Sequence, residues 1–182
     1  MNSRPPPAEA YSRVSNPDLF LPLPAIVLEL IDRLEERFEV RRELGVGLDP
    51  ALERSMAVLP TVRLTPAPST AAPITVAFLR GPSIFIRCGR WTELGFPTCS
   101  CDACGATVEG EAHQLSEIFQ GICSGGFREE FVLPFIGSAW RSWSIRTAGH
   151  LQGGGGRISR REARKLIGTG PRRWEWEPWR RR

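Results

Sequence analysis

Three cysteines within six residues place the strongest local constraint on this chain. Cys99, Cys101 and Cys104 form a C-x-C-x-x-C run. Three thiols cannot all pair with one another, and neighbours separated by one or two residues are poorly placed for relaxed disulfides. Thiolates are soft ligands that favour zinc, and short spacings in a tight loop let several sulfurs meet at one ion. The run therefore predicts a cysteine loop over residues 96–106 that is structural and binds zinc.

Three sulfurs do not complete the tetrahedral shell of a structural zinc ion, so a fourth ligand must come from elsewhere. The candidates are Cys88 or His113 and, besides these, Asp102 and Cys123. A second, separated C-x-x-C pair is absent. Two other interpretations therefore stay open: a reduced loop that only packs, and a thiol-redox pair formed by Cys101 and Cys104.

The cysteine run, with three further segments, resembles a family of uncharacterised actinobacterial proteins that carries a C-x-C-D-x-C signature. The further segments are residues 73–78, 125–129 and 176–179. The resemblance covers residues 20–182, and the cysteine run is its most specific part. It implies a bacterial, cytoplasmic setting and one shared architecture. It implies no activity, cofactor or catalytic residue.

Length and composition predict one domain in a reducing compartment. The chain has 182 residues, of which 41% are apolar, enough for one sizeable core. Its five cysteines are an odd number, and its start lacks the pattern of a secretory signal. Pro22 and Pro24 interrupt the apolar run at residues 20–30. We therefore expect a cytoplasmic protein with no membrane partner.

Apolar periodicity predicts an α+β domain over residues 19–148. Helical spacing marks residues 24–38, 107–124 and 160–167, and Asp49-Pro50 favours a short helix toward Ala57. Strand patterns occupy residues 62–65, 74–79, 84–88, 127–133 and 140–147. Because consecutive strands have short links, we expect a mainly antiparallel sheet of about five strands, with the two main helices packed on one face.

Three segments outside this domain have distinct compositions. Residues 1–18 are rich in proline and polar residues, which predicts a disordered arm, and residues 149–156 read as a glycine-rich flexible hinge. Residues 157–182 form a basic tail with ten basic and three acidic residues, whereas the whole chain has a net charge of only +4. Any electrostatic attraction of the protein for anionic partners should therefore come from the tail.

The tail interleaves Trp174, Trp176 and Trp179 with arginines. Such a run can bind nucleic acid, because indoles stack on bases while arginines contact phosphates. It can equally fold back on its own domain. Glu175 and Glu177 alternate with the first two tryptophans, so an extended chain would direct both rings to one side. We therefore favour docking, with at least one of the three rings buried.

No pattern of catalytic residues emerges. The chain has two histidines, His113 and His150, and no G-x-S-x-G motif to partner either. Glu129 and Glu130 are adjacent on an expected strand, so they point to opposite faces and cannot act as a carboxylate pair. The sequence thus favours a small accessory or binding protein, with a protein or nucleic-acid partner, over an enzyme.

Overall fold

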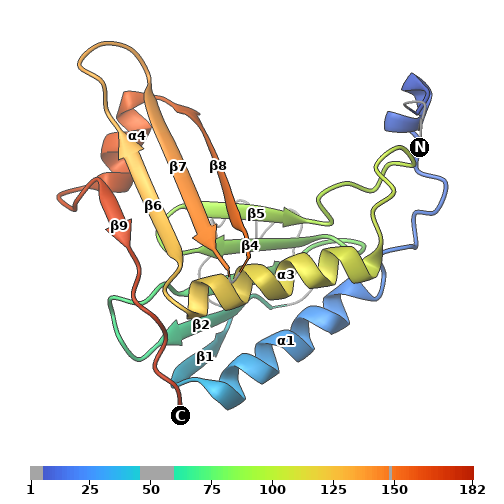
Figure 1. Ribbon diagram of the computed structural model, residues 1–182, viewed down its shortest axis with the longest axis horizontal. Coiled ribbons are helices and arrows are strands. Elements are labelled where there is room, and N and C mark those ends of the chain that lie inside the picture. Colours follow the sequence, from blue (N-terminus) through green and yellow to red (C-terminus); the bar gives the residue numbers. More distant parts are fainter. Residues whose placement is uncertain (1–5, 46–59, 148) are drawn as a thin grey trace.

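The fold is α+β, as the sequence predicted, but it contains two antiparallel sheets. The computed structural model describes residues 6–45, 60–147 and 149–182. Within them lie a five-stranded and a four-stranded sheet (Figure 1). The helices are η1 (Ala8–Tyr11, a 3-10 turn), α1 (Leu23–Arg37), α3 (Val108–Cys123) and α4 (Arg160–Ile167). The strands are β1 (Val40–Leu44), β2 (Val62–Pro66), β3 (Ile74–Phe78), β4 (Ile84–Cys88), β5 (Thr92–Phe96), β6 (Phe127–Val132), β7 (Ala139–Arg146), β8 (Leu151–Ile158) and β9 (Arg173–Glu175).

The five-stranded sheet is a meander in which each strand pairs with the next along the chain. Alternate residues of β2 and β4, such as Leu64 and Ile86, are buried. They share one core with Ile31 of α1 and Leu115 of α3. The two main helices therefore cover one face of this sheet, as predicted, because each presents one apolar stripe that must be buried (Figure 1).

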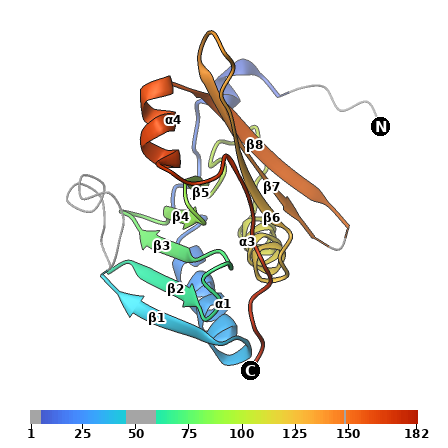
Figure 2. The same ribbon diagram turned by 90° about the vertical axis from the view of Figure 1, so that its left-hand side faces the viewer.

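The four-stranded sheet has the order β8-β7-β6-β9, and its strands run steeply across the direction of β4 and β5 (Figures 1 and 2). One turn of α4 packs on it through Ala163 and Ile167, which join Phe131 of β6 in a second, smaller core. Trp91, from the turn between β4 and β5, completes this core. The two sheets are therefore connected by side-chain packing as well as by the backbone.

Helix α3 belongs to both halves of the molecule. It lies on the first sheet and also contacts β7, where Gly121 meets Ile145. A Cβ atom at Gly121 would collide with the Ile145 side chain, so only glycine permits this close approach. Ile145 and Phe127 extend the main core into the second sheet. The contact therefore connects the helix layer of the first sheet to the second sheet.

The glycine-rich segment forms a strand and not a flexible hinge. Residues 153–156 lie inside β8, paired with β7 in a continuous antiparallel register. The indole of Trp143 covers Gly154. A Cβ atom placed on Gly154 would lie 3.0 Å from the indole nitrogen. Aromatic rings can cover strand glycines in this way and replace the packing that the glycines lack. Sequence reasoning missed this because glycine runs have weak strand propensity.

The structure also contains elements that the sequence did not predict, in the N-terminal arm and in strands β1 and β5. Residues 8–11 of the expected disordered arm form η1, and the following residues contact the cysteine loop. Strand β1 was not predicted, because its sequence of valine, charged residues and leucine lacks a clean alternation. The short helix expected from Asp49-Pro50 toward Ala57 lies outside the described residues. Among the described helices, none is long and apolar enough to cross a bilayer.

The C-terminal residues fold back onto the body, as predicted. Strand β9 pairs with β6, and Trp179 is buried in the main core. Its indole nitrogen donates to the carbonyl oxygen of Ala72 at 2.9 Å, and its ring meets Phe38 edge-on. The expected docking of a tryptophan is thus confirmed. The tail is part of the second sheet and not an appendage.

Candidate metal centre

The cysteine loop runs from the end of β5 to the start of α3, and both of its ends are fixed. At the first end, the buried carboxylate of Glu111 on α3 accepts hydrogen bonds from Thr98, at 3.0 Å from the amide and 2.6 Å from the hydroxyl. At the second, the Thr107 hydroxyl accepts from the amide of Gly110 and caps α3. The loop therefore has a defined shape.

The loop brings its three sulfurs together. The Sγ atoms of Cys99 and Cys101 lie 3.2 Å apart, and those of Cys101 and Cys104 lie 3.3 Å apart. All three ligand atoms lie within 4.8 Å of one another. These two separations are shorter than the 3.5 to 4 Å that tetrahedral zinc–sulfur bonds would give, and no disulfide joins these cysteines. The group could hold a metal ion.

Cys101 and Cys104 differ in acidity. Hydrogen bonding with Cys99, and next with Cys104, lowers the pKa of the Cys101 thiol. The neighbouring thiols of Cys99 and Cys101 raise the pKa of Cys104 to about 12, since a second thiolate beside the first is disfavoured. Cys101 therefore ionises before Cys104. A cation bound between the sulfurs would remove this difference, because a metal ion favours the thiolate form of each ligand.

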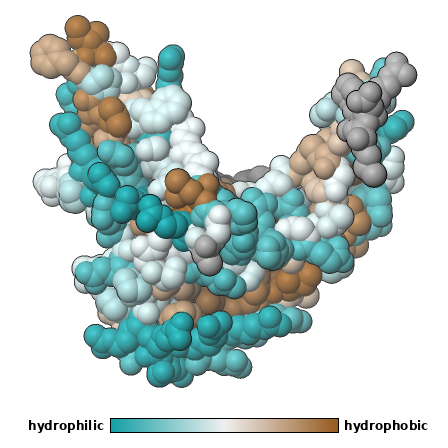
Figure 3. Space-filling view, in the orientation of Figure 1, coloured by the Kyte–Doolittle hydropathy of each residue, from teal (hydrophilic) through white to brown (hydrophobic). Residues whose placement is uncertain are grey.

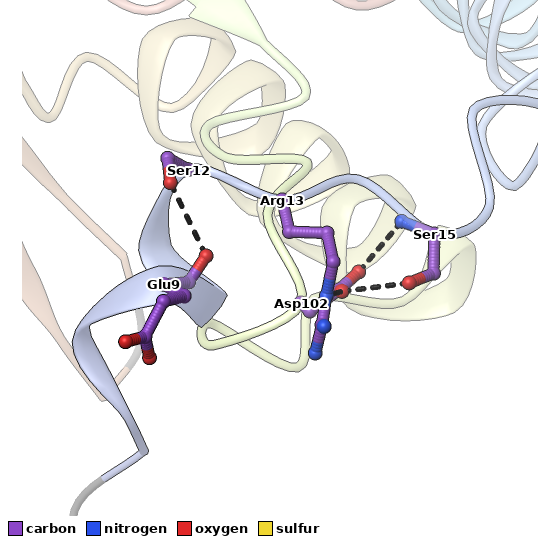
Figure 4. A network of polar contacts seen from close by, with 5 residues as sticks. All are labelled: Glu9, Ser12, Arg13, Ser15 and Asp102. Carbon is purple, nitrogen blue, oxygen red and sulfur yellow. Dashed lines mark hydrogen bonds and ion pairs between the residues drawn. The ribbon is translucent and has the colours of Figure 1, made fainter.

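Asp102, between the second and third cysteines, holds the N-terminal arm and does not face the sulfurs. Its carboxylate accepts from Nε of Arg13, and from the amide and hydroxyl of Ser15, each at 2.8 Å (Figure 4). These bonds lower its pKa, the Ser15 amide contributing most. The backbone adds two bonds, from the amides of Asp102 and Ala103 to carbonyl oxygens of the arm. The arm and the loop thus form one unit.

The expected fourth ligands do not join this group. Within the described residues, the metal-capable cluster consists of the three loop cysteines. Cys88 is completely buried in β4, where burial raises its pKa, and burial raises the pKa of Cys123 to about 12. The side chain of His113 is 76% exposed on α3, with Nε2 3.7 Å from a carboxylate oxygen of Glu117. The structure therefore brings together three of the predicted ligands.

A second polar site, at Glu129 on β6, was not predicted. The side chain is fully buried, and its carboxylate accepts five hydrogen bonds. The donors are the amides of Arg90, Trp91 and Thr92, the Thr92 hydroxyl, and the indole of Trp176. Burial raises the pKa of Glu129, while the Arg90 and Trp91 amides act in the opposite direction. The sequence signal was its inward position, between Phe127 and Phe131 on an alternating strand.

Glu129 joins parts of the chain that are distant in sequence. Its donors come from the turn between β4 and β5 in the first sheet, and from the C-terminal segment after β9. Four of the five are N–H groups, which can only donate, so the acceptor oxygens of a carboxylate match them. This arrangement is a structural junction between the two sheets and the C-terminal segment.

The fold and the cysteine loop define an α+β protein with two antiparallel sheets and a compact group of three thiols. The chain belongs to a family of unknown function, DUF6226, whose model matches residues 1–182. This agrees with the resemblance to an uncharacterised family noted above. Searches of the curated proteins and of the solved structures gave no match.

Proposed function

We propose that the protein is a cytoplasmic accessory or binding protein in which Cys99, Cys101 and Cys104 hold a structural zinc ion. The observation that carries the proposal is the convergence of the three sulfurs within 4.8 Å. Three thiolates form a soft ligand set that suits zinc better than magnesium or calcium. The fixed ends of the loop support it, because a preformed site costs less conformational entropy on binding.

The position of the loop suggests what the ion would do. One side of the loop bonds to α3 through Glu111, and the other bonds to the arm through Asp102. A metal between the sulfurs would cross-link the loop at this junction of β5, α3 and the arm. The contribution is to folding free energy, as in other structural zinc sites. This role requires no catalytic residue.

The first prediction concerns metal content. Protein purified without chelator should contain about one zinc ion per chain, and the Cys101→Ser variant should contain almost none, because two remaining thiols cannot hold zinc tightly. Elemental analysis measures this directly. Ser100→Ala, in the same loop but without a sulfur ligand, is the matched control and should retain the metal. His113 lies outside the three-sulfur group, so His113→Ala should also retain the metal, whereas a lowered zinc affinity would assign His113 as the fourth ligand.

Metal-free wild-type protein with five titratable thiols would contradict the zinc proposal. In that case a reversible disulfide between Cys101 and Cys104 under mild oxidation would support the redox alternative. The nucleic-acid alternative has less support, because Trp176 bonds to Glu129 and Trp179 is buried, so neither ring is available to stack on bases.

The second prediction links the metal to the N-terminal arm. Removing zinc with a chelator, or replacing Asp102 by alanine, should increase the rate of trypsin cleavage after Arg13 severalfold, because the bonds to Arg13 and Ser15 depend on the loop's shape. Mass spectrometry of early digests locates the cut. Asp18→Ala is the control, since its exposed side chain lies outside this network. Equal cleavage rates with and without chelator would show that the contact between the arm and the loop does not depend on the metal.

A further inference from the structure

The connection between β6 and β7 exposes two large apolar side chains at its tip. Phe135 is 95% exposed and its neighbour Ile136 is 83% exposed. Val132 and Trp140, at the ends of the same two strands, are each about half exposed. In the orientation of Figure 1 this tip is the highest point of the second sheet, and Figure 3 shows apolar atoms gathered there. Single exposed apolar residues are ordinary, whereas exposed apolar groups gathered in one place are typical of interaction surfaces.

The tip is held in this conformation by groups from other elements. Arg160, the first residue of α4, donates from Nη1 to the carbonyl oxygens of Pro134 and Phe135, at 2.9 and 2.8 Å. Leu133 packs against the smaller core, and Gly137 adopts a φ of 95°, which favours glycine. The apolar pair is therefore presented outward by a supported turn.

Positive charge lies beside the apolar tip. Residues 133–138 contain no charged residue, and α4 carries four basic residues and one acid. Because Ala163 and Ile167 are the buried positions of α4, its basic residues lie on the other side of the helix. The two basic residues near its start are Arg160, which bonds to the tip itself, and Arg161. The guanidinium group of Arg160 therefore lies directly at the apolar tip, and further basic side chains follow it along α4.

We propose that this tip binds the surface of an anionic lipid membrane, with Phe135 and Ile136 inserted at the boundary between headgroups and acyl chains. Arginines of α4 contact the lipid phosphates. Apolar insertion and attraction to anionic headgroups together are the two components of reversible interfacial binding. Trp140 suits the headgroup level, where indoles are favoured. A convex tip with flanking cations fits a fluid anionic surface better than a groove on another protein.

This contact is peripheral, so it differs from the membrane-spanning segment that the described helices lack. It departs from the expectation, from sequence alone, of no membrane partner. That expectation was based on the lack of a long apolar run that could span a bilayer. Residues 132–136 are only a short apolar segment, interrupted by Pro134. The proposal is independent of the metal centre, which lies at the other end of the molecule (Figure 1).

Vesicle sedimentation tests the proposal. The full-length protein should bind vesicles of equal parts phosphatidylcholine and phosphatidylglycerol, and it should bind pure phosphatidylcholine vesicles much more weakly. The double variant Phe135→Ser/Ile136→Ser should reduce the partition coefficient by at least about tenfold, because two inserted apolar side chains are lost. Both residues are almost fully exposed, so the variant should keep the wild-type circular dichroism and melting temperature.

Leu151→Ser is the matched control. Leu151 is 68% exposed at the opposite end of the second sheet, so its replacement should leave vesicle binding unchanged. Arg161→Ala/Arg164→Ala should weaken binding to the anionic vesicles and flatten its salt dependence. Absence of wild-type binding to the anionic vesicles would overturn the proposal, as would binding that the double variant retains in full. Self-association that only the double variant abolishes would assign the tip to a protein contact instead.

Discussion

Replacing Glu129 by glutamine should destabilise the protein by on the order of 2–4 kcal/mol. The fully buried carboxylate accepts from three donors at Oε1 and from two at Oε2. Glutamine has nearly the same shape, but one of its two terminal groups is an NH₂, which cannot accept a hydrogen bond. In either orientation of the amide, its NH₂ group faces N–H or O–H donors that then have no acceptor. Chemical denaturation monitored by circular dichroism measures the loss.

Two further variants make this test specific. Glu129→Ala should be more damaging than glutamine, because it leaves all five donors without an acceptor and adds a cavity. Glu130→Gln is the control: Glu130 is exposed on the opposite face of β6, so its replacement should change stability by no more than about 0.5 kcal/mol. Equal stabilities for the Glu129→Gln and Glu130→Gln variants would show that the junction does not hold the sheets together.

Replacing Trp179 by alanine should cost about 3–5 kcal/mol, the range for large aromatic residues in a packed core. The ring is buried against Phe38, and its nitrogen bonds to the carbonyl of Ala72. The backbone amide of Trp179 also donates to the carbonyl of Cys123 at the end of α3. The variant therefore leaves a cavity and one buried carbonyl without its partner. Thermal and urea unfolding measure the effect.

Phe135→Ala is the control, since it removes an aromatic ring from a site that is 95% exposed and should cost at most about 0.5 kcal/mol. Truncation after Pro171 is the stronger test, because it removes β9, the Trp176 bond to Glu129 and the Trp179 ring together. We expect the truncated chain to lose cooperative unfolding. Wild-type stability in the truncated protein would mean that the tail adds nothing to the fold.

Local periodicity predicted the elements where one face is buried. The helix ending near residue 124 matched α3, with Thr107 as its cap, because amphipathic spacing and capping residues act within one or two turns. Strands β2, β3 and β4 were predicted within a residue or two, β3 from its continuous run of apolar and β-branched residues. The glycine segment failed, because Trp143 and Trp140 supply its packing from the paired strand and nothing local shows this.

The cysteine site was predicted in part. The spacing of Cys99, Cys101 and Cys104 is itself short enough to bring sulfurs together, so the three-thiol group could be inferred from sequence. The contact of Asp102 with Arg13 and Ser15 could not, because those residues are more than 80 positions away. No local pattern encodes which distant segment a loop carboxylate will meet.

The sequence by itself determined the α+β class, the main helices, the central strands, the cysteine loop and the return of the tryptophan tail. Each depends on side-chain type and spacing over a few residues, or on the cost of exposing indoles. Only the tertiary structure decided that there are two sheets, that Glu129 joins them, and that Phe135 and Ile136 stand exposed beside α4. These features depend on which distant surfaces meet, and that depends on the packing of the whole chain.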